Sequence, residues 1–353
     1  MIYNSLYNQN LDETLNNIPN INFLKNKGIL ITGATGLIGS AITDTLIYAN
    51  IVKDLNIHIY AAGRSKERVR QRFERFFDKE FFEFVKYDAT RDLEFDFNVD
   101  YIIHGASNAH PIAYSKQPVE TMIGNFCGLN NLLKYAKTRG VYRTLYISSS
   151  EVYGLKLGNE LYEEEDYGFV DILNPRACYP SSKRASETLC ASYKKEYGLD
   201  VVIVRPGHVY GPTLTPNDSR ASAQFIRNVI EGKDIIMKSP GLQLRSYCYV
   251  FDCVSAILTV LLNGKSGEAY NISNKDSIVS IRELAESLAN CCGRKILFEN
   301  PDDMEISGYN MMVNSALDSG KLENLGWRGL YNIDEGIRST IGILKKSQGN
   351  HVD

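Results

Sequence analysis

The sequence predicts an α/β protein in which a doubly wound parallel sheet is followed by a smaller C-terminal α/β lobe. Short apolar runs alternate with helical segments up to about residue 206, which is typical of parallel strands joined by helices. Gly33, Gly36 and Gly39 follow the first run and open a helix. Beyond about residue 206 the loops lengthen and the alternation weakens. We therefore expect a second lobe over the carboxyl edge of the sheet, where ligands of such sheets bind.

The expected elements follow the hydrophobic pattern in chain order. Residues 1–26 precede the first strand, and Leu11, Leu15 and Ile18 line one side of a short helix that we expect to pack on the main body. The runs expected as strands of the sheet are Gly28–Thr32, Asn56–Ala62, Phe84–Tyr87, Tyr101–His104, Thr144–Ile147 and Val201–Val204. Helices are expected near 37–49, 117–137 and 180–197 beside the sheet, and near 220–231, 252–263, 279–292 and 333–346 in the lobe.

The composition is that of a soluble globular enzyme, with 44% hydrophobic and 23% charged residues. A net charge of -3 gives no electrostatic reason to expect nucleic acid or an anionic membrane as a partner. The seven cysteines form no C-x-x-C pair and no zinc-ligand spacing, so we expect reduced thiols, no metal and a cytoplasmic protein. The polar N-terminus does not resemble a signal peptide, and no apolar run is long enough to cross a bilayer.

The glycine-rich turn after the first strand predicts a dinucleotide site. Glycine allows the backbone to turn tightly and to approach a pyrophosphate, and a helix N-terminus offers free N–H groups to its oxygens. The spacing here is G-x-x-G-x-x-G. The residues of this turn expected to contact the cofactor are Gly33, Thr35, Gly36, Leu37, Ile38 and Gly39.

One residue after the second strand and one after the third bear on the choice of dinucleotide. An acidic residue at the end of the second strand would hold a ribose 2′-hydroxyl, but this strand is followed by Arg64. A cation suits a 2′-phosphate, so Arg64 favours NADP slightly over NAD unless it is a solvated loop charge. Asp88 follows the third strand and is either a contact to the adenine amine or a turn residue.

A second polar cluster lies at the end of the fifth strand and in the next helix. Tyr179 and Lys183 are four residues apart and share one helix face. An ammonium near a buried phenol favours the phenolate and lowers the pKa of the phenol, so Tyr179 is expected to accept the proton of a hydroxyl near neutral pH. Ser149 is expected to donate or relay a hydrogen bond at the same oxygen. Beside a dinucleotide, this set predicts hydride chemistry on an alcohol.

Further motifs accompany these two sites. They are His104–Ser107, Asn125 with Gly128 and Asn131, Ser148–Gly154, Arg205–Pro206, Tyr210–Pro212, and Arg245 with Tyr249–Asp252. Together with Gly33–Gly39 and the Tyr179–Lys183 pair, they make the chain resemble the extended short-chain dehydrogenases/reductases that act on nucleotide sugars, the NAD-dependent epimerase/dehydratase family. The segments Ser150–Glu151, Glu165–Gly168 and Asn174–Arg184 are most similar to UDP-glucuronate decarboxylases.

The resemblance implies a Rossmann-like fold, a nucleotide-sugar substrate and a tightly bound NAD or NADP that is regenerated in each cycle. It divides the chain into an N-terminal extension at 1–26, a dinucleotide-binding domain at 27–205 and a mostly nucleotide-sugar-binding lobe at 206–353. It also implies a homodimer, in which the helices near 117–137 and 180–197 of two copies form a four-helix interface.

The resemblance also implies roles for single residues. Tyr179 takes the proton of the sugar 4-hydroxyl, and Lys183 stabilises the resulting phenolate. Ser150 and Glu151 reach C5 and C6 of the sugar unless Ser150 only caps the turn and Glu151 pairs with a neighbour; Arg245 binds the sugar carboxylate or grips phosphate. The added cofactor contacts are Ala106, Ser107, Asn125, Tyr179 and Lys183, and the substrate contacts are His110, His208, Arg220 and Arg245.

The same catalytic set can run other reactions. A 4,6-dehydratase needs an acid to expel the C6 hydroxyl, and the family's dehydratases have an aspartate where this chain has Ser150. A 4-epimerase needs room for the ketosugar to rotate, and Glu151 would be surplus. A sensor that binds a dinucleotide without turnover would be expected to lose Ser149, Tyr179 and Lys183, all of which are present. Decarboxylation is therefore the expected reaction, with the dehydratase, the epimerase and, more remotely, the sensor as alternatives.

Overall fold

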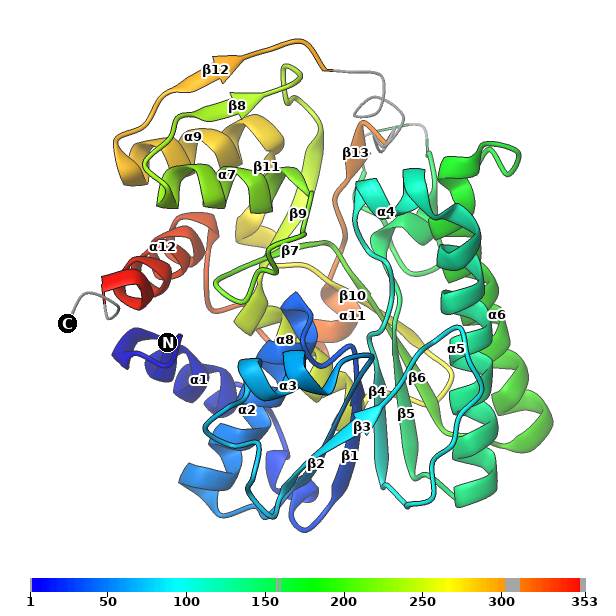
Figure 1. Cartoon of the computed structure of the whole chain (residues 1–353). Coiled ribbons are helices and arrows are strands. Elements are labelled where there is room, and N and C mark those ends of the chain that lie inside the picture. Colours follow the sequence, from blue (N-terminus) through cyan, green and yellow to red (C-terminus); the bar gives the residue numbers. More distant parts are fainter. Residues whose placement is uncertain (1, 157, 159, 302–311, 350–353) are drawn as a thin grey trace.

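The computed structural model of the chain describes residues 2–156, 158, 160–301 and 312–349. Its largest layer is a seven-stranded parallel sheet with the strand order β10-β6-β5-β4-β1-β2-β3 (Figure 1). The strands are β1 Gly28–Thr32, β2 His58–Gly63, β3 Phe82–Lys86, β4 Tyr101–His104, β5 Arg143–Ile147, β6 Val201–Pro206 and β10 Ala269–Ile272. The chain order reverses between β1 and β4, and ligands of such sheets bind at this switch point.

Helices cover both faces of the sheet, because its central strands are apolar on both sides. Ile29 and Ile31 of β1 belong to one core cluster and Leu30 to another, since successive side chains of a strand point to opposite faces. The helices are α2 Leu37–Lys53 and α8 Val250–Asn263 on one face, and α5 Pro118–Arg139 and α6 Cys178–Tyr197 on the other (Figure 1). The expected α/β architecture is therefore confirmed.

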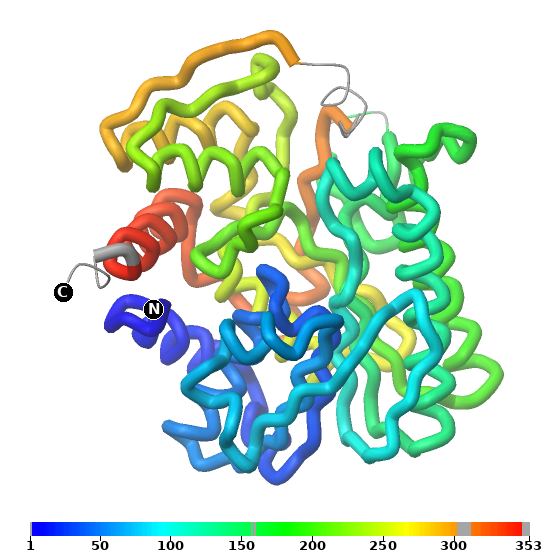
Figure 2. The backbone as a smooth tube through the Cα atoms, viewed as in Figure 1, coloured from blue at the N-terminus to red at the C-terminus, as the bar shows by residue number. Residues whose placement is uncertain are grey.

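A smaller lobe lies beside the carboxyl ends of the strands (Figures 1 and 2). Its sheets contain β7 His208–Tyr210, β9 Leu244–Tyr249, β11 Ile278–Ser280 and β13 Asn314–Ser315, with β8 Ile235–Met237 paired separately with β12 Ile296–Phe298. Its helices are α7 Ala221–Ile230, α9 Ile281–Cys292 and α12 Ile333–Gly349. The shorter helices of the molecule are η1 Ile21–Leu24, α3 Lys66–Arg72, α4 Pro111–Lys116, η2 Ser150–Tyr153, η3 Pro175–Ala177, η4 Lys275–Ser277 and α11 Gly320–Glu323.

The N-terminal extension forms helix α1 (Ser5–Asn16), which lies beside α12 of the lobe and packs on α2 of the large sheet (Figure 2). Its anchor is the buried carboxylate of Asp44 in α2. That carboxylate accepts hydrogen bonds from Tyr3 at 2.7 Å and Tyr7 at 2.5 Å, and it forms an ion pair with Arg72 of α3. Because α1 touches both lobes, the extension helps to hold them together.

Most expected elements are present, with differences at their ends. The second strand begins at His58 and not at Asn56, because Asn56 has a left-handed backbone with φ 50° that does not fit a strand. The helix expected over 37–49 continues to Lys53. The last strand of the large sheet is β10, which the sequence places in the lobe. It follows residue 205 only after α7 and α8, yet it pairs with β6. The functional boundary between residues 205 and 206 stays a prediction.

Two properties of the described part of the chain bear on its partners. No helix there is long and apolar enough to cross a membrane. Among the same residues, no group of three or more His, Cys, Asp or Glu side chains is arranged to hold a metal ion.

Candidate active site

The glycine turn after β1 has the shape that a dinucleotide pyrophosphate needs. Gly33 has a φ of +72°, which side chains other than glycine rarely adopt. A Cβ atom at Gly39 would lie 2.2 Å from the carbonyl oxygen of Gly33, so only glycine fits there. The N-terminus of α2 at Gly36 has no side-chain cap, so its first N–H groups face the turn. Thr35, Leu37 and Ile38 lie in or directly after this turn, as expected, and the turn fits the cofactor.

The residues expected at the adenosine end lie at the same edge of the sheet. Arg64 follows the last residue of β2 and is exposed. The carboxylate of Asp88, after β3, accepts hydrogen bonds from the main chain of Thr90 at 3.0 Å and from its hydroxyl at 2.8 Å. These bonds lower the pKa of Asp88, and the nearby Arg64 guanidinium lowers it further. The Arg64 cation and the Asp88 carboxylate thus lie near one another at the edge of the sheet where the sequence predicts the adenosine half of the cofactor.

A buried amide connects the turn after β4 to the helix that carries Tyr179. Ser107 donates to Oδ1 of Asn125 at 2.7 Å, and Nδ2 of Asn125 donates to Oγ of Ser182 at 2.9 Å. The neighbouring amide of Ala106 donates to the Thr32 hydroxyl at the end of β1 at 3.2 Å. Sequence reasoning had singled out Ala106, Ser107 and Asn125 but not Thr32 or Ser182, which carry no motif of their own.

The expected Ser–Tyr–Lys set comes together at the carboxyl end of β5. Tyr179 and Lys183 are both buried in the first turns of α6. The Ser149 hydroxyl is placed so that it lowers the pKa of the Tyr179 phenol, and its oxygen accepts from the Glu151 amide at 3.2 Å. Nζ of Lys183 donates to the main-chain oxygen of Ile147 at 2.8 Å and lies 5.7 Å from the centroid of the Tyr179 ring. This arrangement can hold a hydroxyl against Ser149 and Tyr179 at once.

The expected effect of Lys183 on the phenol was wrong for the protein without cofactor. Burial raises the pKa of Tyr179 to about 12, and the charge of Glu151 adds to the increase. The Ser149 hydrogen bond, Arg220 and Arg176 oppose it but do not overcome the loss of solvent. Burial also lowers the pKa of Lys183 to about 7, so its ammonium is only partly retained at neutral pH. Desolvation depends on tertiary packing, so the sequence alone does not reveal it.

Ser150 and Glu151 follow Ser149 in η2, as expected. Ser150 is buried. The carboxylate of Glu151 pairs with Arg176, with 2.9 Å between Oε1 and Nη2. Glu151 thus has the neighbouring partner that one alternative expected, and its role at C5 stays a prediction. Arg176 was given no role of its own from the sequence, although its segment was noted; it lies in η3, directly before the helix that carries Tyr179.

Cations from the lobe face this set. Arg245 of β9 is buried, donates to the main-chain oxygen of Leu244 at 2.8 Å, and is close enough to Glu151 for their charges to interact. His208 of β7 has a buried Nδ1 without a partner among the described residues. Burial, followed by the charges of Arg245 and Arg220, lowers its pKa well below the usual value. A neutral imidazole with one open nitrogen therefore lies beside two cations.

The remaining two expected substrate contacts are both bonded to residues of the loop before α7. Arg220 is held by Asp218, with 2.6 Å between Nη2 and Oδ2, and its charge lowers the pKa of Tyr179. The ring of His110, before α4, makes a 3.2 Å hydrogen bond between Nδ1 and the Ser219 hydroxyl. Both residues thus have partners within the protein, and the charge of Arg220 reaches Tyr179.

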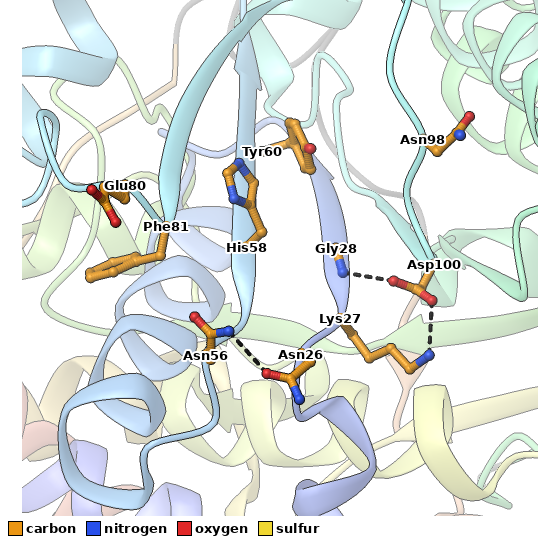
Figure 3. A pocket seen from close by; sticks show the side chains of 10 residues that line it. All are labelled: Asn26, Lys27, Gly28, Asn56, His58, Tyr60, Glu80, Phe81, Asn98 and Asp100. Carbon is orange, nitrogen blue, oxygen red and sulfur yellow. Dashed lines mark hydrogen bonds and ion pairs between the residues drawn. The ribbon is translucent and has the colours of Figure 1, made fainter.

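A separate pocket of about 520 Å³ lies at the opposite edge of the large sheet (Figure 3). It is lined by residues at the amino ends of β1 and β2, including His58 and Tyr60. Figure 3 shows Asp100 accepting from the Gly28 amide at 2.8 Å and pairing with Lys27 at 3.0 Å. Because the strands point away from this edge, the pocket is distinct from the candidate active site.

The strand order, the glycine turn and the Ser–Tyr–Lys set define a dinucleotide-dependent enzyme with a Rossmann-like fold. The model of the NAD dependent epimerase/dehydratase family matches residues 29–273. The chain belongs to that family.

The similarity to known proteins extends over almost the whole chain. UDP-glucuronic acid decarboxylase 1 of Xenopus tropicalis is 32% identical over 96% of this chain and 78% of its own. UDP-glucuronic acid decarboxylase 6 of Arabidopsis thaliana is 32% identical over 92% of both chains. A solved dTDP-glucose 4,6-dehydratase of Streptomyces venezuelae with NAD bound has a TM-score of 0.79 and 25% identity, over 91% of this chain and 98% of that chain.

Proposed function

We propose that the protein decarboxylates a nucleotide-linked uronic acid, most closely UDP-glucuronate, through a transient ketone at C4 of the sugar. The observation that carries the proposal is the convergence of Ser149, Glu151 and Tyr179 at the carboxyl end of β5, opposite the buried Arg245. The decarboxylase relatives support the same reaction, since they match more than nine-tenths of this chain.

The residues of the chain divide the work as follows. Tyr179 accepts the proton of the 4-hydroxyl, while Ser149 holds that oxygen and Lys183 stabilises the phenolate. The chemistry that a bound NAD or NADP would supply is the transfer of hydride from C4 and its return. The 4-ketone makes the uronic acid a β-keto acid, so carbon dioxide leaves and the electron pair spreads onto the ketone oxygen. Arg245 binds the carboxylate beforehand, and Ser150 and Glu151 serve C5 when it is protonated.

The cofactor is proposed to stay bound and to be regenerated within each cycle. Arg64 at the end of β2 favours NADP at the adenosine end. Calorimetric titration of cofactor-free protein measures this preference, and Arg64→Ala should weaken NADP binding while leaving NAD binding nearly unchanged. An equal loss for both dinucleotides would refute the assignment.

The substrate contacts proposed in the lobe are His110, His208, Arg220 and Arg245. Mass analysis after incubation with a panel of nucleotide sugars tests the reaction itself. Loss of carbon dioxide from UDP-glucuronate is expected. Loss of water from a neutral hexose would instead identify a dehydratase, which the likeness to the Streptomyces enzyme keeps as the second candidate. An unchanged mass with a new retention time would identify an epimerase.

A dinucleotide sensor is distinguished from an enzyme by Tyr179→Phe. The phenylalanine keeps the ring and its packing but removes the group that accepts the proton. An enzyme should lose turnover by about 10³-fold and still bind cofactor. A sensor would keep its output.

A homodimer through α5 and α6 is also proposed. Val119, Met122, Ile123 and Phe126 of α5 are exposed although apolar, and their spacing places them on one helix face. An apolar stripe of this kind on the long helix pair fits a second copy of the chain. Sedimentation should show a dimer, and Ile123→Glu should convert it to a monomer; a wild-type monomer at micromolar concentration would contradict the interface. The cytoplasm is proposed as the compartment, where the seven unbridged cysteines stay reduced.

A further inference from the structure

A row of stacked groups runs from Tyr179 to Glu151. The ring of Tyr179 stacks on that of Tyr114, with 4.6 Å between centroids and 27° between planes. The guanidinium carbon of Arg176 lies 4.5 Å from the centroid of the Tyr114 ring. Nη2 of Arg176 lies 2.9 Å from Oε1 of Glu151. Every neighbouring pair in this row, which we call the ladder, is in direct contact.

The ladder is assembled by the fold and not by one segment. Tyr114 comes from α4, Glu151 from η2 and Arg176 from η3, and all three are kept largely from solvent. A planar guanidinium can lie over a ring and still donate in its own plane to a carboxylate. Arg176 is therefore the member that joins the aromatic half of the ladder to the charged half.

We propose that Arg176 is a positioning residue of the reaction centre, which holds the Tyr179 phenol and the Glu151 carboxylate in fixed relative positions through the Tyr114 ring. The inference rests on the proposed function, because it concerns the base for C4 and the carboxylate beside C5. It adds a residue that acts through Tyr114 and Glu151.

The charges along the ladder give this role a signature. After burial, Glu151 is the next cause that raises the pKa of Tyr179, and Arg176 is among the groups that lower it. Removing Arg176 alone leaves the carboxylate uncompensated and should raise the pKa of the phenol further. Removing Glu151 alone should lower it, and removing both should return it toward the wild-type value. If Arg176 only supported folding, its removal and the removal of Glu151 would not shift the pKa of Tyr179 in opposite directions.

The kinetic test compares Arg176→Gln, Arg176→Lys and a matched control. Displacement of the base from its working position should reduce kcat by about 10²-fold in Arg176→Gln, and the limb of the pH–rate profile that reports the base should move to higher pH. Arg176→Lys should restore the limb but not kcat, because an ammonium keeps the charge but not the flat stack. The control is Arg70→Gln, since Arg70 also has a carboxylate at 3.7 Å and a ring at 5.1 Å but is exposed on α3; its kinetics should equal those of the wild type.

A second readout needs no substrate. Carbon-13 NMR of protein labelled at tyrosine Cζ reports the phenolate fraction of Tyr179, whose signal is assigned with Tyr179→Phe. At the highest pH at which all proteins remain folded, this fraction should be largest in Glu151→Gln, smallest in Arg176→Gln and intermediate in the double variant and the wild type. If Arg176→Gln does not fold, Arg176→Lys and Tyr114→Leu provide the comparison.

The outcomes separate this inference from the proposed function. If Arg176→Gln matches Arg70→Gln in both the phenolate fraction and the pH–rate profile, the positioning role is wrong. If the wild type decarboxylates no nucleotide sugar, the proposed function is wrong, and the phenolate fractions then decide the role of Arg176 by themselves.

Discussion

Replacing Asp44 by alanine should loosen the N-terminal helix from the large sheet. The buried carboxylate accepts from Tyr3 and Tyr7 and pairs with Arg72, whose side chain is largely buried as well. Its removal leaves one cation and two phenols without their acceptor, and breaking a buried pair in this way costs about 3–5 kcal/mol of unfolding free energy. With about 2.1 cal/mol/K of unfolding entropy per residue, 353 residues give about 0.74 kcal/mol/K, so the melting temperature should fall by about 4–7 °C.

Differential scanning calorimetry of wild type, Asp44→Ala and Asp96→Ala measures this effect. Asp96 pairs with Arg139 at 3.1 Å, but its side chain is fully exposed, so Asp96→Ala should leave the melting temperature unchanged. The double variant Asp44→Leu with Arg72→Met removes both charges and should recover part of the loss. Equal melting temperatures for Asp44→Ala and Asp96→Ala would refute the reasoning that the Asp44 cluster anchors α1.

Three further predictions concern the active site. Ser149→Ala removes a hydrogen bond that lowers the pKa of Tyr179, so turnover should fall about 10²-fold and the base limb of the pH–rate profile should move to higher pH; an unmoved limb would contradict it. Burial lowers the pKa of Lys183 to about 7. The unfolded chain therefore binds this proton more tightly, and the free energy of unfolding falls as the pH drops from the ordinary lysine pKa to about 7. Lys183→Met should therefore abolish turnover but melt higher than the wild type at pH 7, with the advantage shrinking toward pH 10, and a lower melting temperature at pH 7 would be the contrary result. Gly39→Ala forces a Cβ to within 2.2 Å of the Gly33 oxygen, so calorimetric titration should show at least a tenfold loss of dinucleotide affinity, about 1.4 kcal/mol, and an unchanged affinity would mean that the turn does not bind the cofactor.

The large sheet could be predicted from the sequence because its signals are local. Most strands from β1 to β6 contain an apolar run, although β3 also contains Glu83 and Lys86, and the glycine turn after β1 fixes where α2 begins. The strand β10 could not be predicted, since Ala269–Ile272 is short and its partner β6 lies far away along the chain. Nothing in those four residues indicates which of the two lobes they join.

The active site could be predicted in its members but not in its electrostatics. The four-residue spacing of Tyr179 and Lys183 and the position of Ser149 after β5 indicated three side chains that the fold places near one another. The pKa of Tyr179 depends on how much solvent the surrounding elements exclude, which no spacing reveals. Arg176 escaped notice for a related reason, because its partners Tyr114 and Glu151 are neighbours only in the folded chain.

The groups proposed to handle protons are Ser149, Glu151, Tyr179 and Lys183. They all lie between the end of β5 and the first turns of α6, whereas His208 and Arg245 lie on two strands of the other lobe. Because the two sets lie on different elements, residues of one set can be substituted without changing the other. Substitutions on β7 and β9 would change which substrate binds, while the residues proposed for the oxidation step stay the same. A single ancestral scaffold could diversify in this way into catalysts for many sugars.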